Sequence, residues 1–352
     1  MEPRDLFDVT IIGGGPAGLY SSFYSGLREM KTKLIEYQSE LGGKLHVYPE
    51  KMIWDVGGQT PITGAKLMRQ LIEQGLTFQP EVVLNEKVVS IARGEDGIFV
   101  LRAASGRLHY SKTVIIAVGG GILTPQKLEL EGAEKFEVSN LHYTVKSIHS
   151  FKDKTVIISG GGNSAIDWAN ELEPVAKKVY VTHRKEALTG HEAQVTQLLN
   201  SSATCFFRTS ITKLIASASR EAVESVELTH HETGEVTILP IDDVIISHGY
   251  QRDASLLESS ELGIAMVDDY YVAGNANGET SIPGLYAAGD IIKYDGKLHL
   301  IQGAFQDAAN AVNKAKQHVQ PEANSYAMVS SHNEIFQQRN RELVKRMLQG
   351  QP

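Results

Sequence analysis

The chain has 352 residues, which is enough for two or three domains of ordinary size. Hydrophobic residues make up 42% of it and charged residues 22%, as is typical of a soluble globular protein. A net charge of −8 argues against a nucleic-acid partner, and the single cysteine, Cys205, excludes an internal disulfide and a cysteine-based metal cluster.

The amino-terminal region contains an uncharged stretch over residues 9–27. A membrane span would have that length, but three consecutive glycines and a proline interrupt this stretch. The preceding residues also lack the basic start of a signal peptide. We therefore expect a cytoplasmic protein that does not associate with membranes.

A glycine fingerprint follows the first strand-like run. Residues 8–18 read DVTIIGGGPAG, with Gly13, Gly15 and Gly18 at the fingerprint positions and a helix-like stretch behind them. A strand, this turn and a helix together form a dinucleotide-binding motif, in which a pyrophosphate sits at the positive end of the helix. Glu36 ends the next strand-like run, and a carboxylate there accepts hydrogen bonds from a ribose 2′-hydroxyl. The first site therefore suits FAD or NAD.

A second fingerprint begins 147 residues after the first, since Gly160 corresponds to Gly13. Residues 155–165 read TVIISGGGNSA, with Gly160, Gly162 and Ala165 at the three positions. The following strand-like run ends in His183, Arg184 and Lys185, and cations at this point accommodate a 2′-phosphate. The second site therefore suits NADP, and the pair predicts a flavin enzyme that exchanges hydride with NADPH.

Each fingerprint is followed by a similar middle section. Hairpin-like alternation covers residues 88–102, 107–118 and 211–239, and strand-like runs then reach Gly119 and Gly249. The two halves thus form a diverged internal repeat. The predicted fold class is α/β, with two Rossmann-like, three-layer dinucleotide-binding domains, one inserted into the other. We place an FAD-binding domain at residues 1–120 plus 252–352 and an NADP(H)-binding domain at 121–251.

The return to the first domain contains a strand-like run into Gly289 and Asp290, followed by a helix over about residues 300–318. An Asp before a helix is commonly a cap or turn residue. We interpret Asp290 instead as the carboxylate that holds the ribityl and phosphate region of a flavin. A last helix-like stretch, about residues 333–348, carries Arg339, Arg341, Lys345 and Arg346 as a solvated face or a patch for an acidic partner.

The twelve histidines are scattered, and none has metal-ligand spacing. His230 and His231 lie beside an expected turn and are interpreted as surface residues, whereas His142 and His248 lie near the domain crossings. We predict no metal site.

The fingerprints, the His183-Arg184 ending and the AAGD segment at residues 287–290 resemble the pyridine nucleotide–disulfide oxidoreductase group, in particular its thioredoxin reductase-like branch. This resemblance implies non-covalent FAD in the outer domain, NADP(H) in the inserted one, and a homodimer. The Cys-x-x-Cys dithiol of thioredoxin reductases is missing, because Leu141 and Thr144 stand roughly where its cysteines would be. Thiol–disulfide exchange through the chain's own cysteines is therefore excluded.

Without the dithiol, the chain resembles the thioredoxin reductase-like ferredoxin–NADP⁺ reductases, as the stretches LGGKLHVYPEK, WDVG and NSAIDWA indicate. This resemblance implies electron transfer between NADP(H) and ferredoxin or flavodoxin through FAD. Tyr48 would stack on one flavin face, the alternative being a half-buried aromatic residue. A tail residue, either His332 or Val329, would cover the other face.

The resemblance carries over a set of residues for each nucleotide. The FAD set is Gly13, Gly15, Pro16, Ala17, Gly18, Glu36, Gly43, Lys44, Tyr48, Val88, Gly119, Asp290 and Ser331. The NADP set is Gly160, Gly162, Asn163, Ser164, Ala165, His183, Arg184 and Lys185.

Two features leave the function open. Relatives carry His-Arg-Arg-x-x-x-Arg where this chain has Lys185 and Thr189 in place of the last two arginines, so the preference for NADPH is expected to be weaker than usual. The electron acceptor leaves no motif. Alternative functions are an NADPH-dependent disulfide or peroxide reductase acting through a separate thiol protein, a diaphorase or flavin oxidase, and a non-catalytic flavoprotein sensor.

Overall fold

The computed structural model describes residues 5–121, 124–251, 253–328 and 334–349. They form two compact units, each described here by itself. Unit 1 takes its described residues from 1–46, 52–122 and 252–352, and unit 2 from 47–51 and 123–251. The short segment Val47–Lys51 thus belongs to unit 2, although the chain on both sides of it belongs to unit 1.

Unit 1 is built on a seven-stranded sheet in the order β5-β2-β1-β8-β7-β6, with β21 paired to β8. The pairs among β5, β2, β1, β8 and β21 are parallel, whereas β6, β7 and β8 pair antiparallel. The strands are β1 (Leu6–Ile12), β2 (Thr32–Ile35), β5 (Glu81–Val83), β6 (Val88–Arg93), β7 (Phe99–Ala103), β8 (Leu108–Ile116) and β21 (Leu285–Ala287). The predicted hairpin at residues 88–102 is therefore present as β6 and β7.

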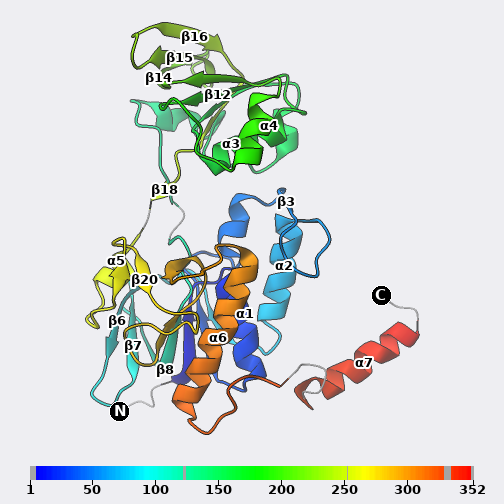
Figure 1. The fold of residues 1–352 in the computed structure, drawn as a ribbon, viewed down its shortest axis with the longest axis vertical. Helices are drawn as coiled ribbons and strands as arrows, with labels where there is room; N and C mark the ends of the chain where they lie inside the picture. The colour runs from blue at the N-terminus through cyan, green and yellow to red at the C-terminus, as the bar shows by residue number, and fades with distance from the viewer. Residues whose placement is uncertain (1–4, 122–123, 252, 329–333, 350–352) are drawn as a thin grey trace. The chain divides into compact units, whose positions relative to one another are not determined.

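Helices cover one face of this sheet, as Figure 1 shows. Helix α1 (Pro16–Leu27) packs between α2 (Gly64–Gly75) and α6 (Ile301–Val319), and α6 also contacts β8. The other face buries α5 (Ser255–Glu258) and a small sheet of β19 (Met266–Val267), β20 (Tyr271–Ala273) and β22 (Ile292–Lys293). The sheet is therefore the middle of three layers, and its strands are apolar on both faces, as buried parallel strands are.

Unit 2 repeats the plan with a five-stranded parallel sheet in the order β10-β17-β11-β12-β13. These strands are β10 (Leu141–His142), β11 (Thr155–Ser159), β12 (Lys178–His183), β13 (Thr204–Phe207) and β17 (Asp243–Ile246). Val156 and Ile158 of β11 face one core with α3 (Asn163–Leu172) and α4 (Glu192–Leu199), whereas Ile157 faces the other. The second core is closed by an antiparallel sheet of β14 (Thr209–Ala216), β15 (Val223–His230) and β16 (Val236–Pro240).

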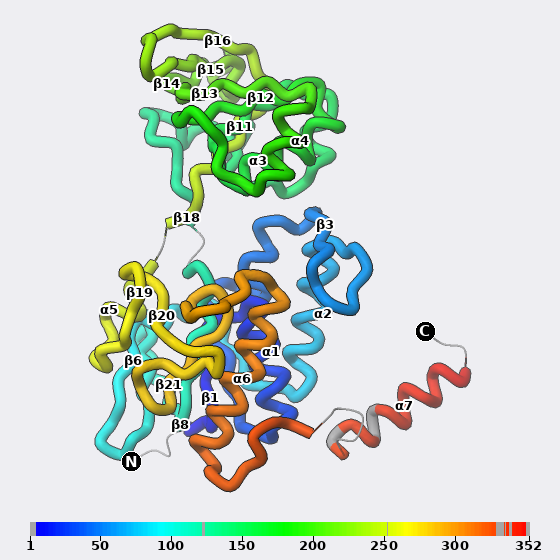
Figure 2. The backbone as a smooth tube through the Cα atoms, viewed as in Figure 1, coloured from blue at the N-terminus to red at the C-terminus, as the bar shows by residue number. Residues whose placement is uncertain are grey.

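Short elements complete the chain, and the backbone tube in Figure 2 follows them from end to end. They are η1 (Gly43–Val47), β3 (Met52–Ile53), β4 (Ile62–Thr63), β9 (Thr124–Pro125), η2 (Ala133–Phe136), η3 (Ile148–Phe151), β18 (Tyr250–Gln251), η4 (Gly289–Ile291), η6 (Glu334–Phe336) and α7 (Gln337–Leu348). Strands β9 and β18 pair antiparallel, so the two stretches of chain that enter and leave unit 2 are hydrogen-bonded to each other.

The structure confirms the predicted fold class, with two Rossmann-like three-layer units. The expected helix at about 300–318 is α6, and the tail helix begins at Gln337. In the part of the chain that the structure describes, no helix is both long and apolar enough to cross a membrane.

Candidate cofactor sites

The turn between β1 and α1 leaves no room for side chains at two of its glycines. Gly13 has φ +109°, and a Cβ there would lie 2.5 Å from the carbonyl oxygen of Ala117. A Cβ on Gly18 would lie 1.8 Å from the carbonyl oxygen of Gly13. Helix α1 therefore starts directly against its own turn, with Pro16 in its first turn and no side chain capping it. Its free backbone N–H groups form the kind of site that binds a pyrophosphate.

Glu36 lies beside this turn, and both of its carboxylate oxygens bind backbone. Gly14 N–H donates to Oε2 at 2.6 Å, and Gln38 N–H donates to Oε1 at 2.7 Å. The residue is 8% exposed. Each carboxylate oxygen retains a lone pair that can accept a hydrogen bond from a ribose hydroxyl. The predicted ribose acid is thus fixed next to the predicted pyrophosphate turn.

The loop that contains Gly43 closes over the same turn. Gly42 N–H donates to the Gly14 carbonyl oxygen at 2.9 Å, and a Cβ on Gly43 would lie 2.7 Å from the Cα of Gly15. The two glycines therefore meet backbone to backbone. This cradle of bare backbone fits a dinucleotide, which needs close approach of N–H groups to its phosphates.

Asp290 follows Gly289, which lies beside the first turn of α1. Gly289 has φ +81°, and a Cβ there would lie 2.8 Å from Ala17 Cβ in the first turn of α1. The Asp290 side chain is 49% exposed, with His299 Nδ1 4.0 Å away. It lies in η4 and does not cap α6, whose N-cap residue is Leu300. The carboxylate is therefore accessible to a ligand.

The other predicted FAD residues are placed less tightly. Gly119 has φ +57° and open space around it, and its carbonyl oxygen accepts a hydrogen bond from Tyr270 Oη at 3.2 Å. Lys44 is exposed in η1, whereas the side chain of Val88 is buried in the core and leaves only its backbone for a ligand. Tyr48 is half-buried and packs against the core of unit 2 that includes Trp168. Val329, Ser331 and His332 lie outside the described residues.

The turn between β11 and α3 repeats the first geometry with one difference. Gly160 has φ +151°, and a Cβ there would lie 2.4 Å from the carbonyl oxygen of Ser247. The third fingerprint position is Ala165, whose buried Cβ is accommodated. Gly162 is open on its Cβ side, and it caps α3 without a side-chain hydrogen bond. Ser164 is exposed beside it, and Asn163 Oδ1 accepts from His191 N–H at 2.9 Å.

His183 lies on top of this second turn. A Cβ on Gly161 would lie 2.3 Å from its Nδ1, and its buried Nε2 has no hydrogen-bond partner among the described residues. Burial, and then the charges of Lys185 and Arg184, lower the pKa of His183 below its ordinary value of 6.5. Arg184 and Lys185 are exposed and form no ion pair with the described residues. An orphaned nitrogen and two unpaired cations fit a 2′-phosphate.

Two further residues lie beside this site: Thr189, which the sequence places at the last arginine position of the relatives' motif, and His248, which it places near a domain crossing. Thr189 donates to the Gly161 carbonyl oxygen through its N–H at 2.7 Å and its hydroxyl at 3.2 Å. His248 Nε2 and Ser159 Oγ are hydrogen-bonded at 2.8 Å. Burial, and then the charges of Arg184 and His183, lower the pKa of His248. The sequence could have placed His248 at this site, because His248 follows a strand and precedes a glycine. The carboxyl ends of parallel strands meet at the edge of the sheet where nucleotides bind.

The remaining histidines of interest have structural partners. His142 Nε2 pairs with Asp243 Oδ1 at 2.6 Å, and Lys154 binds the other oxygen of that carboxylate at 2.9 Å. Nδ1 of His230 accepts from two backbone N–H groups of the β15–β16 turn. The described residues contain no group of His, Cys, Asp or Glu side chains suited to a metal ion.

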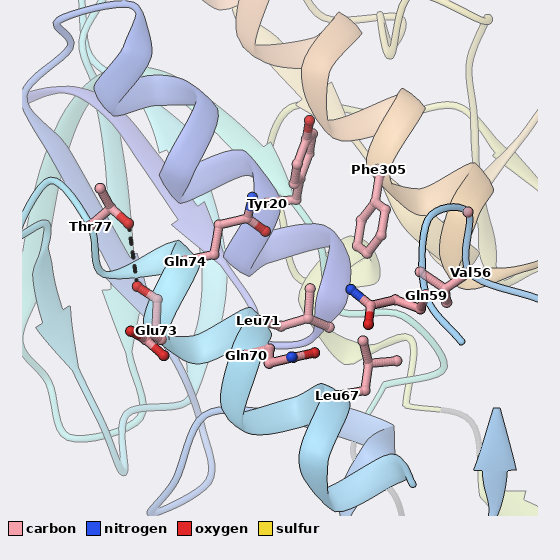
Figure 3. A pocket seen from close by; sticks show the side chains of 11 residues that line it. Tyr20, Val56, Gln59, Leu67, Gln70, Leu71, Glu73, Gln74, Thr77 and Phe305 are labelled. Carbon is pink, nitrogen blue, oxygen red and sulfur yellow. Dashed lines mark hydrogen bonds between the residues drawn. The ribbon is translucent and has the colours of Figure 1, made fainter. Parts of the chain in front are cut away.

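A pocket of about 530 Å³ opens in unit 1, and its lining includes none of the described residues that are predicted to bind FAD. Figure 3 shows Leu67, Leu71 and Val56 beside the rings of Tyr20 and Phe305, whose centroids are 5.0 Å apart. The amides of Gln59, Gln70 and Gln74 also line it. The lining of the pocket therefore combines apolar side chains with three amide groups.

The sequence profile of the pyridine nucleotide-disulphide oxidoreductases matches residues 7–315, nearly nine-tenths of the chain. The chain belongs to this family. It is therefore an oxidoreductase, and the family together with the two nucleotide turns identifies its cofactors as FAD and NADP(H).

Relatives within the pyridine nucleotide-disulphide oxidoreductases match over their full length. Ferredoxin–NADP reductase 1 of Bacillus mycoides is 73% identical over 348 residues, which cover 99% of this chain and 100% of the relative. Ferredoxin–NADP reductase 2 of Exiguobacterium sibiricum is 70% identical over 348 residues, covering 99% of both chains.

Solved structures of thioredoxin reductases share the fold. The enzyme of Lactococcus lactis, in the FR conformation, is 26% identical with a TM-score of 0.75, covering 89% of this chain and 99% of its own. That of T. acidophilum gives the same TM-score and coverage at 23% identity. Leu141, where a thioredoxin reductase would carry a cysteine, is 1% exposed in β10, and Cys205 lies alone in β13. This member of the family therefore has the fold of a thioredoxin reductase without its dithiol.

The first prediction concerns Gly18. Substitution Gly18→Ala would force α1 away from the turn, because its Cβ would overlap the Gly13 carbonyl oxygen. We expect the Kd for FAD to rise at least about tenfold, which corresponds to about 1.4 kcal/mol. Flavin fluorescence on dilution of the holoenzyme measures it. Gly120→Ala is the control, since a Cβ there meets nothing within 4 Å; equal effects of the two variants would contradict the steric argument.

The second prediction concerns pH. A bound 2′-phosphate favours protonated His183, so the gain in affinity is full below the lowered pKa of the free protein and is lost as the pH rises. We expect KM for NADPH to rise between about pH 5 and about pH 8, and KM for NADH to change less. Steady-state rates with a dye acceptor measure both constants. The 2′-phosphate itself titrates at about pH 6, so His183→Gln is the control. If the rise in KM for NADPH with pH survives in this variant, His183 is not its source.

Proposed function

We propose that the chain is a ferredoxin–NADP⁺ reductase, which moves electrons between NADP(H) and an iron–sulfur or flavin carrier through FAD. The observation that carries this proposal is the 73% identity, over 99% of this chain, to a protein named ferredoxin–NADP reductase 1. The missing dithiol supports the same function, because single-electron carriers do not need a thiol relay.

The proposed site residues divide into two sets with different tasks. In unit 1, the bare backbone of the first turn, Glu36 and Asp290 would hold FAD. In unit 2, the second turn with His183, Arg184 and Lys185 would hold NADP(H). The bound flavin supplies the redox chemistry, because it accepts hydride and can release electrons singly. The side chains bind and orient the cofactors and provide no general base.

The faces of the flavin are assigned by the family resemblance. Tyr48 would stack on one face, and a tail residue, His332 or Val329 with the neighbouring Ser331, would cover the other. The half-buried ring of Tyr48 is compatible with a stacking residue. Exchange of the tail cover for nicotinamide would then accompany hydride transfer.

Helix α7 supplies positive charge for a carrier. Arg341, Lys345 and Arg346 are exposed on it, although the whole chain has a net charge of −8. An acidic carrier such as ferredoxin or flavodoxin would be attracted to a local cationic surface of this kind.

We further infer a cytoplasmic homodimer that binds neither nucleic acid nor membranes. Leu343, Val344, Met347 and Leu348 of α7 are each more than half exposed. An apolar edge of this kind on a helix favours burial against another surface. A second copy of this chain is the partner that the family resemblance implies.

The experiment that tests the proposed function is NADPH-driven reduction of cytochrome c by the purified holoenzyme, with and without ferredoxin. We expect ferredoxin to raise the rate about tenfold or more, and NADPH to serve better than NADH because of the cations at the second site. Without a ferredoxin-dependent rate, but with rapid reduction of quinone or dye acceptors, the proposed carrier would be wrong and the diaphorase alternative would apply.

The homodimer is tested by sedimentation equilibrium of the holoenzyme. We expect a mass of two chains, and dissociation when Met347→Glu and Leu348→Glu place charges on the apolar edge of α7. Gln337→Glu on the same helix is the control, because Gln337 lies outside that edge. A wild-type mass of one chain would contradict the dimer.

A further inference from the structure

A buried ion pair lies in unit 1 next to the predicted flavin segment. Lys297 Nζ is 2.6 Å from Asp307 Oδ2, and the two side chains are 2% and 1% exposed. Asp307 stands on the buried face of α6, among Ala304, Ala308 and Ala311. No motif or predicted role accounts for a carboxylate on this alanine face.

Three donors converge on the Asp307 carboxylate from outside its helix. Gly289 N–H donates to Oδ2 at 3.1 Å, Lys297 donates to the same oxygen, and Tyr294 Oη donates to Oδ1 at 2.6 Å. Burial, and then the hydrogen bond to Asp307, raise the pKa of Tyr294, so its phenol remains a donor throughout the working pH range. The carboxylate thus joins α6 to η4 and to the loop after β22.

The link to Gly289 gives this network a consequence beyond packing. Gly289 adopts φ +81° and is in contact with Ala17 at the start of α1. Asp290 follows Gly289 in the chain, and its side chain is 49% exposed. The Asp307 carboxylate therefore holds the backbone N–H of the residue that sets where Asp290 lies.

Stability alone does not account for the ion pair. Burying two charges costs free energy of desolvation, and well-packed apolar residues of similar volume often stabilise a fold as well or better. An apolar residue at position 307 could not accept the Gly289 N–H, and this hydrogen bond fixes a left-handed turn. The position of the turn therefore requires a hydrogen-bond acceptor at residue 307, which the carboxylate provides.

We propose that Asp307, with Lys297 and Tyr294, is the positioning group that fixes the Gly289–Asp290 turn against α1 for the flavin-bearing half of FAD. The inference rests on the proposed assignment of Asp290 to FAD. Glu36 and the fingerprint turn would hold the adenosine half. Among the described residues, the Asp307 carboxylate is hydrogen-bonded to Gly289, Tyr294 and Lys297 and to none of those groups. Loss of the network should weaken binding of FAD and leave binding of an adenosine diphosphate unchanged.

The test compares FAD with ADP on the full-length chain. The principal variant is Asp307→Leu with Lys297→Met, which removes both charges and replaces the ion pair by apolar side chains of similar volume. We expect its Kd for FAD to rise about tenfold or more. The inhibition constant of ADP, measured by displacement of FAD with flavin fluorescence, should change by less than about twofold, and the melting temperature with saturating ADP should stay within about 3 °C of wild type.

A second variant and a matched control keep the outcome clear. Tyr294→Phe removes one donor and no charge, and we expect it to raise the Kd for FAD about threefold. Asp268→Asn breaks the exposed ion pair with Lys293, close by in the same unit, and should change neither constant.

Three results would overturn the proposal: an unchanged Kd for FAD in the double variant, equal weakening of FAD and ADP, or, if the double variant does not fold, an unchanged Kd in Tyr294→Phe. These measurements use no ferredoxin and no turnover. Failure of the proposed carrier would therefore leave this test intact, and failure of this test would leave the carrier assay intact.

Discussion

The closeness of helix α1 to its own preceding turn is the constraint on which unit 1 depends. The 1.8 Å that would separate a Cβ on Gly18 from the Gly13 carbonyl oxygen fixes how far the helix can slide along the sheet. That position brings the N-terminus of α1 next to Glu36 on one side and next to Gly289 on the other. The predicted ribose acid Glu36, the predicted pyrophosphate turn and the segment that carries Asp290 therefore all lie around one helix end.

The two units share one backbone plan but carry opposite charges after their second strands. In unit 1 the carboxylate after the second strand is nearly buried and bound to backbone, whereas in unit 2 the corresponding His183 is followed by two exposed cations. A carboxylate repels a 2′-phosphate and cations attract it. The two predicted sites therefore differ in the charge that follows the second strand of each unit, which suits an unphosphorylated ribose in unit 1 and a 2′-phosphate in unit 2.

The sequence predicted those parts of the structure that are determined by interactions between residues close together in the chain. The fingerprint glycines, the strands that flank them and helix α6 could be located because turn geometry and apolar periodicity act over a few residues. The pairing of β9 with β18 and the membership of Val47–Lys51 in unit 2 depend on residues far apart in the chain. The Asp307 network joins residues 10 to 18 positions apart, but it depends on how a helix packs against an irregular loop, which apolar periodicity does not encode. The sequence does indicate an unusual role for Asp307, because it is a charged residue on a helix face that otherwise carries alanines. The cofactor roles of individual residues, such as Tyr48 and Lys44, stay predictions because the same positions could serve packing alone.

Glu36 also determines which of the two sites can change its ligand over evolutionary time. Its carboxylate accepts hydrogen bonds from the backbone at Gly14 and Gln38, so replacing it would disturb the turn as well as the predicted ribose contact. The side chains of Arg184 and Lys185 are exposed and form no hydrogen bond or ion pair with the described residues, although the Lys185 carbonyl oxygen accepts from Arg208 N–H. On the predicted assignment of the two sites, the preference between NADPH and NADH could therefore change through surface substitutions on one loop, whereas a change at Glu36 would also alter the fold of its turn.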